Sequence, residues 1–356
     1  MEELRYGMEG YAVKLLQYAL GRAGLDAGNP DGIFGRRTAR ALLRFQRDRG
    51  LSSDGAAGRL TWAALYPYLA GYTLHRVRPG DPMPEAAVGE TATVPLDLPV
   101  VADGMPWSYL MHGLAVKGLA MRYPFLKVQE IGRSVMGRPI LALSMGGGQR
   151  QVACAGPHRG DQWAAAAALL RFVESYADAH IRGGTIGGIS AKRAFEETTL
   201  HMVPLVNPDG TDLVTGALSS LDSFYGQAQA LAAYYPDVPF PIGWRSNISG
   251  VDLSLQYPGG WDAKRKSSYR TGYTRPGPLG YVGGEPLIAP EVRALARWTR
   301  EHGFSLILAF DEGYRDWFSG TWGRPALALE AGKAWRCEDI YAKNLPPMAQ
   351  RLLFSP

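Results

Sequence analysis

Cysteine is nearly absent from this chain. Its 356 residues include only Cys154 and Cys337, and neither lies in a CxxC or mixed Cys/His pattern. This excludes a disulfide framework and argues against a structural zinc site built on cysteine. We expect both cysteines to be buried or incidental thiols.

Long apolar runs and a strong charge of one sign are also lacking. No stretch approaches the ~18 consecutive apolar residues of a membrane span. The N-terminal MEELRYGMEGYAVKLLQ lacks a basic segment followed by an apolar one, so we expect no signal peptide. As written, the chain is expected in the cytoplasm, or at the cell wall or a spore by a route that the sequence does not show.

The charge balance limits the choice of partners. The 38 Lys and Arg exceed the 33 Asp and Glu only slightly, and they form no long basic run. Nucleic acid is therefore a poor candidate ligand, whereas a mild attraction to an anionic polymer such as cell wall is compatible with the surplus. Composition is otherwise that of a globular protein with room for two or three domains.

Residues 1–70 form the first predicted domain. Apolar residues recur at helical spacing in GMEGYAVKLLQYALGRAGL and RTARALLRFQRDRGL, DG turns follow at Asp31 and Asp54, and a short helix starts near Leu60. With EGYAVKLLQ, DGIFGRRT, ALLRFQ and DGAAGRLTW, this segment resembles the peptidoglycan-binding module of bacterial cell-wall hydrolases. The alternative is a generic three-helix unit without a ligand.

Residues 71–99 are rich in Pro and Gly. YTLHRVRPGD resembles the first strand of a LysM glycan-binding module and VGETATVP its last strand, but the two intervening helices are missing. Because so short a segment can hardly bury a core of its own, we expect a degenerate LysM-like linker that packs on a neighbour.

Residues 100–356 alternate between apolar strands and amphipathic helices. The predicted strands are PILALSMGG, RQVACAG, TTLHMVPLVNP, FSLILAF and RPALALEAG, and the predicted helices are WAAAAALLRFVESYA and APEVRALARWTREHG. This order indicates an α/β domain whose mixed sheet is covered by helices on both faces. Functional loops of such domains gather at the carboxyl ends of the strands.

Five stretches of this domain, IGRSVMGRPI, LVNPDGTDLV, GVDLSLQYPGGWD, GYRDWF and RPALALEAGK, together resemble the carboxypeptidase A-like zinc metallopeptidases. The likeness is closest to the bacterial branch that cleaves the γ-D-glutamyl–diaminopimelate bond of peptidoglycan stem peptides. The resemblance implies the carboxypeptidase A-like fold. It also implies a zinc ion held by a His and a Glu after one strand and a His after a later strand.

The first two ligand positions of that family carry other residues here. The family pattern G-x-H-H-x-N-E-W lies on Gly156–Trp163 without a gap, which places Arg159 on the ligand His and Gln162 on the ligand Glu. A register shifted by one residue instead pairs His158 with Asp161 as an H-x-x-D half-site. If Arg159 enters the former metal pocket, it is expected to pair with Glu330 and Asp311.

The remaining family positions are only partly retained. Asp311 stands where the later His normally follows A-F, Ser249 and Ser254 replace a substrate-binding Arg and Asn, and Glu330 matches the general base. We expect two other matching elements to be scaffold. The turn Asn207–Gly210 is expected to need positive φ at its glycine, and Asp252 is expected to accept hydrogen bonds from nearby backbone.

Three hypotheses follow. The first is a peptidoglycan-binding pseudopeptidase that uses no cofactor and binds stem peptides or a protein partner without cleaving them. The second is an active zinc peptidase with His158, Asp161 and Asp311 as ligands and Glu330 as base, which requires these four side chains to converge. The third is a structural or assembly protein of a spore or cell envelope.

Overall fold

The computed structural model describes residues 3–76, 91–95, 97–101, 104–331 and 336–353. The chain divides into two compact units, Met1–Met105 with Gly113–Pro124 and Pro106–His112 with Phe125–Pro356. Helix α4 (Tyr109–Arg122) contributes residues to both units. Among the described residues, no helix combines the length and apolar character needed to cross a membrane.

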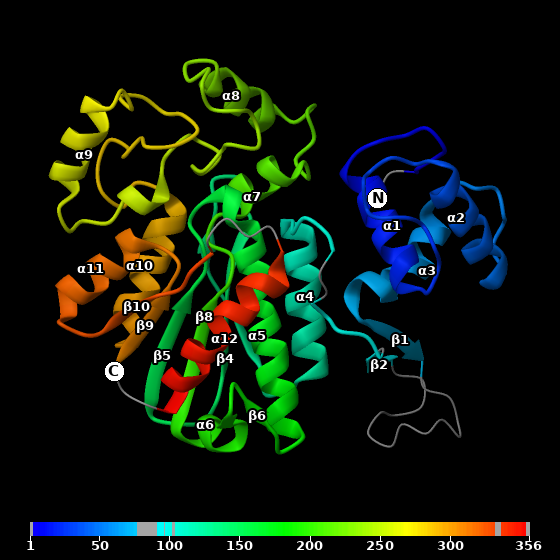
Figure 1. Ribbon diagram of the computed structural model, residues 1–356, viewed down its shortest axis with the longest axis horizontal. Coiled ribbons are helices and arrows are strands. Elements are labelled where there is room, and N and C mark those ends of the chain that lie inside the picture. Colours follow the sequence, from blue (N-terminus) through cyan, green and yellow to red (C-terminus); the bar gives the residue numbers. More distant parts are fainter. Residues whose placement is uncertain (1–2, 77–90, 96, 102–103, 332–335, 354–356) are drawn as a thin grey trace. The chain divides into compact units, whose positions relative to one another are not determined.

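The N-terminal unit contains the three expected helices, α1 (Tyr11–Arg22), α2 (Arg36–Asp48) and α3 (Arg59–Ala70) (Figure 1). Their apolar residues recur at helical spacing and are almost completely buried at Leu16, Leu42, Phe45 and Leu65. The helical module predicted from periodicity is therefore confirmed.

An internal repeat organises this module. In each half a buried glutamine on a helix donates to an aspartate, a threonine and a backbone carbonyl, and accepts from the glycine of a DG turn. The first set is Gln17, Asp31, Ile33, Thr38 and Gly32, and the second is Gln46, Asp54, Ala56, Thr61 and Gly55. Both turn glycines have positive φ, which explains the DG pairs seen in the sequence.

The segment expected to be a LysM-like linker contains two strands. β1 (Tyr72–Arg76) and β2 (Thr91–Pro95) pair antiparallel, with Tyr72 opposite Pro95. These are the two strands that the resemblance implied. Residues 77–90, where the intervening helices would lie, fall outside the described part of the chain.

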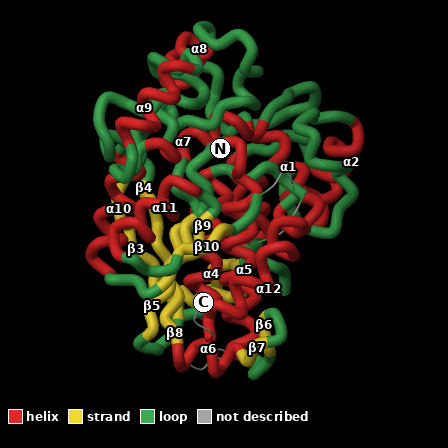
Figure 2. The backbone as a smooth tube through the Cα atoms, turned by 60° about the vertical axis from the view of Figure 1, so that its left-hand side comes forward, coloured by secondary structure: helices red, strands yellow, loops and turns green. Residues whose placement is uncertain are grey.

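The second unit is built on a six-stranded mixed sheet, drawn in yellow in Figure 2. β8, β5, β9 and β10 run parallel, and β4 and β3 add antiparallel pairs at one edge. The strand order is β10 (Ala326–Ala328), β9 (Leu306–Ala309), β5 (Arg150–Ala155), β8 (Thr198–Val203), β4 (Pro139–Met145) and β3 (Lys127–Arg133). The predicted mixed sheet is confirmed.

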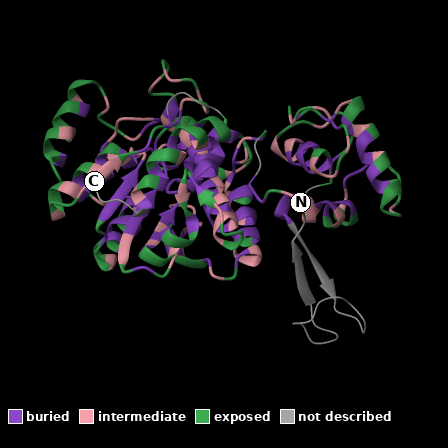
Figure 3. Cartoon of the chain, turned by 60° about the horizontal axis from the view of Figure 1, so that its bottom comes forward, coloured by how far each residue is buried: buried purple, intermediate pink, exposed green. Residues whose placement is uncertain are grey.

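Helices cover both faces of this sheet. α10 (Pro290–His302) and α11 (Glu312–Trp322) lie on one side of it in Figure 1, and α5 (Trp163–Ile181) and α12 (Cys337–Leu353) lie on the other. Figure 3 shows buried residues concentrated along the strands and the inner sides of these helices. Cys154 and Cys337 are both buried, as expected, and they are not joined in a disulfide.

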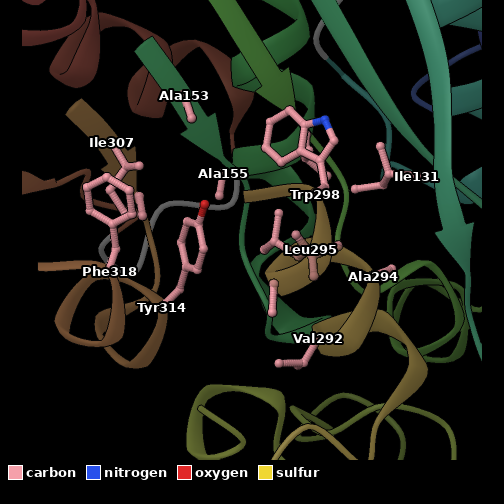
Figure 4. Close-up of a cluster of buried hydrophobic side chains, with 14 of the residues drawn as sticks. Ile131, Ala153, Ala155, Val292, Ala294, Leu295, Trp298, Ile307, Tyr314 and Phe318 are labelled. Carbon is pink, nitrogen blue, oxygen red and sulfur yellow. The ribbon is translucent and has the colours of Figure 1, made fainter. Parts of the chain in front are cut away.

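The core beneath α10 and α11 is shown in Figure 4. Leu295 and Trp298 of α10 and Tyr314 of α11 pack with Ala155 and Ile307 of the central strands. Small alanines on β5 leave room for these large side chains, and complete burial of each large apolar side chain contributes about 1.5–3 kcal/mol. This packing places the carboxyl ends of β5 and β9 next to the first turn of α11.

The shorter elements lie in the connections. They are η1 (Gly160–Gln162), β6 (Thr185–Ile186), β7 (Ile189–Ser190), α6 (Ala191–Glu197), α7 (Pro208–Thr215), α8 (Ser223–Ala232), η2 (Leu253–Leu255) and α9 (Trp261–Arg270). The long connecting segment between α7 and α10 has its own apolar cluster, which includes the completely buried Trp244. This cluster stabilises the segment beside the strand ends.

Candidate functional site

The residues singled out from the sequence lie at the carboxyl ends of the parallel strands. Gly156–Trp163 follow β5, Asn207 follows β8, Asp311 follows β9 and Glu330 follows β10. Because these strands run parallel, their carboxyl ends meet at one edge of the sheet, where α/β proteins usually bind ligands. The side chains differ in where they point from that edge.

His158 is buried at this edge, with 1% of its surface exposed. Its Nε2 lies 2.6 Å from the hydroxyl of Tyr257, and its ring packs against those of Tyr257 and Tyr314, which also contact each other. Its Nδ1 has no hydrogen-bond partner and lies 3.9 Å from Oδ2 of Asp311. Tyr257 was not singled out from the sequence, because it lies 99 residues away along the chain.

Asp311 serves as the N-cap of α11. Its Oδ1 accepts a hydrogen bond from the backbone N–H of Tyr314 at 2.8 Å, and its Oδ2 accepts one from Oγ of Ser254 at 2.5 Å. A carboxylate at this position is also stabilised by the partial positive charge at the N-terminal end of the helix. Asp311 therefore has a structural task, and Ser254 supports it.

Arg159 points to Asp161. Its Nε and Nη2 donate to the two carboxylate oxygens of Asp161 at 2.9 and 2.6 Å, a bidentate ion pair. Nε of Arg245 lies 3.4 Å from the same carboxylate. The expectation that Arg159 enters the former metal pocket and pairs with Glu330 and Asp311 is wrong, because its guanidinium pairs with Asp161, two residues away. Gln162 is half-buried at the N-cap position of α5.

Glu330 points toward solvent, with 64% of its side chain exposed. It forms an ion pair with Nζ of Lys343, and its backbone N–H and C=O bond to the side chain of Asn344. Both partners belong to α12, and sequence reasoning did not identify them. Of the four side chains that the alternative metal site requires, His158 and Asp311 approach each other, whereas Asp161 pairs with arginines and Glu330 with a lysine, and no three of the four gather around one point.

Asp252 is part of the scaffold, as expected. Its carboxylate accepts hydrogen bonds from the backbone N–H groups of Ser254 at 3.2 Å and Gly280 at 2.9 Å. Burial raises the pKa of this carboxyl, and the Asp311 carboxylate raises it further, although the two hydrogen bonds and Arg159 oppose these effects. Ser249 is exposed on the same loop.

The Asn207–Gly210 turn is the cap of α7. Oδ1 of Asn207 accepts from Gly210 N–H at 3.0 Å, and its Nδ2 donates to the carbonyl of His158 at 2.9 Å. The expectation of positive φ at Gly210 is wrong, because this residue is helical. Gly210 is required by close approach, since a Cβ there would lie 2.6 Å from the carbonyl oxygen of Ser246.

Three buried acidic residues and a half-buried arginine behind this turn were also missed. Arg138 pairs with Asp212 at 2.9 Å and lies 3.6 Å from Asp209, while Glu291 accepts from Asn247 and from the N–H of Val135. Burial, and to a smaller extent the Asp209 carboxylate, raise the pKa of Glu291 to about 7. Arg138 and Asp209 stand in the quoted motifs IGRSVMGRPI and LVNPDGTDLV, which could have indicated such a cluster.

The residues at this edge do not fit a zinc ion held by two His and a Glu. In the described ranges, no three His, Cys, Asp or Glu side chains gather within reach of one metal ion. His158 and Asp311 approach each other, but the imidazole Nε2 and both carboxylate oxygens already have partners. Arg159 is a permanent cation without an acceptor atom and so cannot serve as a ligand.

Comparison with protein families identifies both parts of the chain. The zinc carboxypeptidase (peptidase M14) model matches residues 115–347, and the peptidoglycan-binding domain model matches residues 9–65. The first match covers well over half of the chain, and the second covers the helical module with both DG turns.

Two curated relatives are similar to this chain. The γ-D-glutamyl-L-diamino acid endopeptidase 1 of Lysinibacillus sphaericus is 29% identical over 266 residues, which are 64% of this chain and 65% of that protein. The uncharacterized protein YqgT of Bacillus subtilis is 31% identical over 221 residues, 62% of this chain and 56% of that protein. The matches thus span less than two thirds of either relative.

Among solved structures, the metallo-carboxypeptidase of Burkholderia cenocepacia is similar, with 15% identity and a TM-score of 0.45 over 70% of this chain and 69% of that one. The implied family is confirmed by the model match over the second unit. The chain belongs to the zinc carboxypeptidase family and carries a peptidoglycan-binding domain at its N-terminal side.

Proposed function

We propose that this protein binds peptidoglycan and that its carboxypeptidase-like domain holds a stem peptide without hydrolysing it. The observation that carries the proposal is the ion pair between Arg159 and Asp161. The resemblance assigns the position of Arg159 to a zinc ligand of the family. A guanidinium has no acceptor atom, so Arg159 cannot replace a ligand histidine, and its ion pair occupies both carboxylate oxygens of Asp161, one ligand of the alternative site.

Glu330 supports the same conclusion. A general base must point toward the bond it acts on, and this carboxylate pairs with Lys343 in an exposed position. Water has a pKa of ~15.7 and is a poor nucleophile near neutral pH unless a metal lowers that value. Hydrolysis by the remaining side chains is therefore expected to be negligible.

The proposed ligand follows from the family and from the charges at the site. The endopeptidase relative is named for a γ-D-glutamyl-L-diamino acid bond, which belongs to peptidoglycan stem peptides. Arg159 and Arg245 share the single carboxylate of Asp161, and their side chains are 33% and 43% exposed. The pair of guanidiniums carries one positive charge more than Asp161 neutralises, which suits the carboxylates of a stem peptide.

The purified protein is expected to contain well under one zinc per chain after incubation with excess zinc, and to release no product from L-alanyl-γ-D-glutamyl-diaminopimelic acid. Metal analysis and product chromatography measure both. The matched variant restores the family ligands, Arg159→His with Gln162→Glu and Asp311→His, and is expected to retain more zinc. Stoichiometric zinc with turnover in the unmodified protein would show an active peptidase and contradict the proposal.

Arg245→Ala is expected to weaken binding of the same tripeptide several-fold, equivalent to roughly 1 kcal/mol, because one exposed charge-assisted contact is lost. Calorimetric titration measures the affinity. Arg182→Ala is the control, since Arg182 pairs with Asp178 in an exposed position on α5 and its turn. Equal affinities of the Arg245→Ala and Arg182→Ala variants would show that the arginines are not part of the binding site.

A further inference from the structure

Two loops of the second unit enclose a pocket that the proposed stem-peptide site does not use. The first loop follows α8 and the second follows α9, and Figure 1 shows these helices at the same end of the unit. The pocket has a volume of about 240 Å³. We call it the tyrosine pocket, and it is lined by Tyr234, Tyr235, Pro236, Asp237, Val238, Thr271, Gly272 and Tyr273.

Two tyrosine rings of this pocket rest on glycine backbone. A Cβ at Gly277 would lie 2.1 Å from the ring of Tyr235, and one at Gly280 would lie 2.5 Å from the ring of Tyr273. The two rings are nearly parallel, with an interplanar angle of 24° and centroids 5.8 Å apart. The Tyr235 hydroxyl donates to the carbonyl of Arg275 at 2.7 Å. These contacts hold the rings in a set orientation, so little entropy is lost when a ligand binds them.

A third ring stands at the rim. Tyr234 is 61% exposed, although burial of an aromatic side chain is usually favourable. The guanidinium of Arg275 lies 4.6 Å from its ring centroid, a cation–π contact that fixes both side chains. Asp237 and Thr271 are exposed nearby. The pocket therefore combines aromatic faces with charged and hydroxyl groups that can form hydrogen bonds.

The loop below these rings also belongs to the proposed stem-peptide site. Gly280 N–H donates to Asp252 at 2.9 Å, Gly277 N–H donates to the carbonyl of Gly250 at 3.0 Å, and Arg245 N–H donates to the carbonyl of Pro278 at 2.7 Å. One side of the loop thus contacts the segment that holds Arg245 and Asp252, and the other side carries the tyrosines. A ligand that reaches both places must extend along this loop.

We propose that the tyrosine pocket binds an N-acetylated sugar of the glycan strand, next to the stem peptide held by the arginines. The C–H face of a pyranose ring packs on aromatic rings, and its hydroxyl and acetamido groups require charged or polar partners such as Asp237, Thr271 and Arg275. The inference rests on the proposed function, because the stem peptide is attached to such a sugar. It assigns the carboxypeptidase-like domain a glycan contact of its own.

Hydrogen–deuterium exchange of the full chain can test this locally. Added N-acetylglucosamine tetramer is expected to slow exchange in residues 233–238 and 271–277. This expectation does not depend on whether the tetramer also slows exchange in the peptidoglycan-binding domain, residues 9–65. The tripeptide without sugar is expected to slow exchange around residues 158–162 and 245–254 instead. The two ligands thus report separately on the tyrosine pocket and on the proposed function, so failure of one is distinguishable from failure of the other.

The double variant Tyr234→Ala with Tyr273→Ala is expected to bind the tetramer about ten-fold more weakly, as measured by the sugar concentration needed for half-maximal protection. The double variant Tyr234→Phe with Tyr273→Phe is expected to keep its affinity, because the ring faces remain. Ile181→Ala is the matched control, since Ile181 is 60% exposed and lies at the end of α5. Three results would overturn the proposal: no protection of the pocket by the tetramer, equal protection in the alanine variant, or protection by the tripeptide or a proline-rich peptide in place of the sugar.

Discussion

Between pH 7 and pH 4, the His112→Leu variant is expected to gain roughly 3 kcal/mol in free energy of unfolding relative to the unmodified protein. His112 is almost completely buried, and burial lowers its pKa from 6.5 to about 3. The folded protein therefore holds this histidine neutral, whereas the unfolded chain protonates it below pH 6.5. Its stabilising effect is complete above that value and decreases at ~1.4 kcal/mol per pH unit as the pH falls.

A second histidine acts in the same direction with a smaller effect. Burial, and to a smaller extent the neighbouring His302, lower the pKa of His201 to about 4. His201 is only half-buried, so solvent screening reduces its contribution. Because it is unchanged in the His112→Leu variant, its effect cancels when the two proteins are compared at each pH.

Glu291→Gln is the control of opposite sign. The pKa of Glu291 is raised to about 7, so the folded protein holds this carboxyl protonated at pH 5 while the unfolded chain has already released the proton. Between pH 4.5 and pH 7 the unmodified protein should therefore lose stability relative to the glutamine variant, by roughly 3 kcal/mol. Urea unfolding at several pH values, followed by tryptophan fluorescence, measures both differences. Parallel pH profiles for all three proteins would contradict the assigned protonation states.

Arg138→Met is expected to destabilise the second unit by about 3–5 kcal/mol at pH 7. The Arg138 side chain is 18% exposed and pairs with Asp212, whose side chain is 7% exposed, and it also donates to the carbonyl of Pro208. Its removal leaves the buried carboxylates of Asp209 and Asp212 without a neighbouring cation. An unpaired buried charge costs more than the methionine side chain regains by packing.

The loss should also depend on pH. Burial already raises the pKa of Asp209 and Asp212, and Arg138 opposes this rise. Without the arginine both pKa values rise further, so the folded variant takes up protons more readily and recovers stability as the pH falls. The control Arg182→Met breaks an exposed pair and should cost less than about 1 kcal/mol. A loss no larger than this control, or one independent of pH, would show that the cluster tolerates the missing charge.

Much of the architecture could be read from the sequence because it depends on local patterns. The three helices of the N-terminal module follow from apolar residues at helical spacing and from two DG turns. The strands around Val152, Leu200 and Ile307 are short apolar runs between amphipathic helices, which is the pattern of a sheet buried on both faces. The same reading placed Arg159 and Asp311 at strand ends, because a strand and its following loop are adjacent in sequence.

The sequence by itself determined which residues stand at the strand ends, and its resemblance to the family predicts Arg159, Gln162 and Asp311 at the ligand positions and Glu330 at that of the general base. The tertiary structure alone decided which partners they take. Lys343 lies beside Glu330, and Tyr257 and Ser254 lie beside His158 and Asp311. Ion pairs and hydrogen bonds depend on distances of a few ångströms between distant segments, and a pattern along the chain carries no such distance.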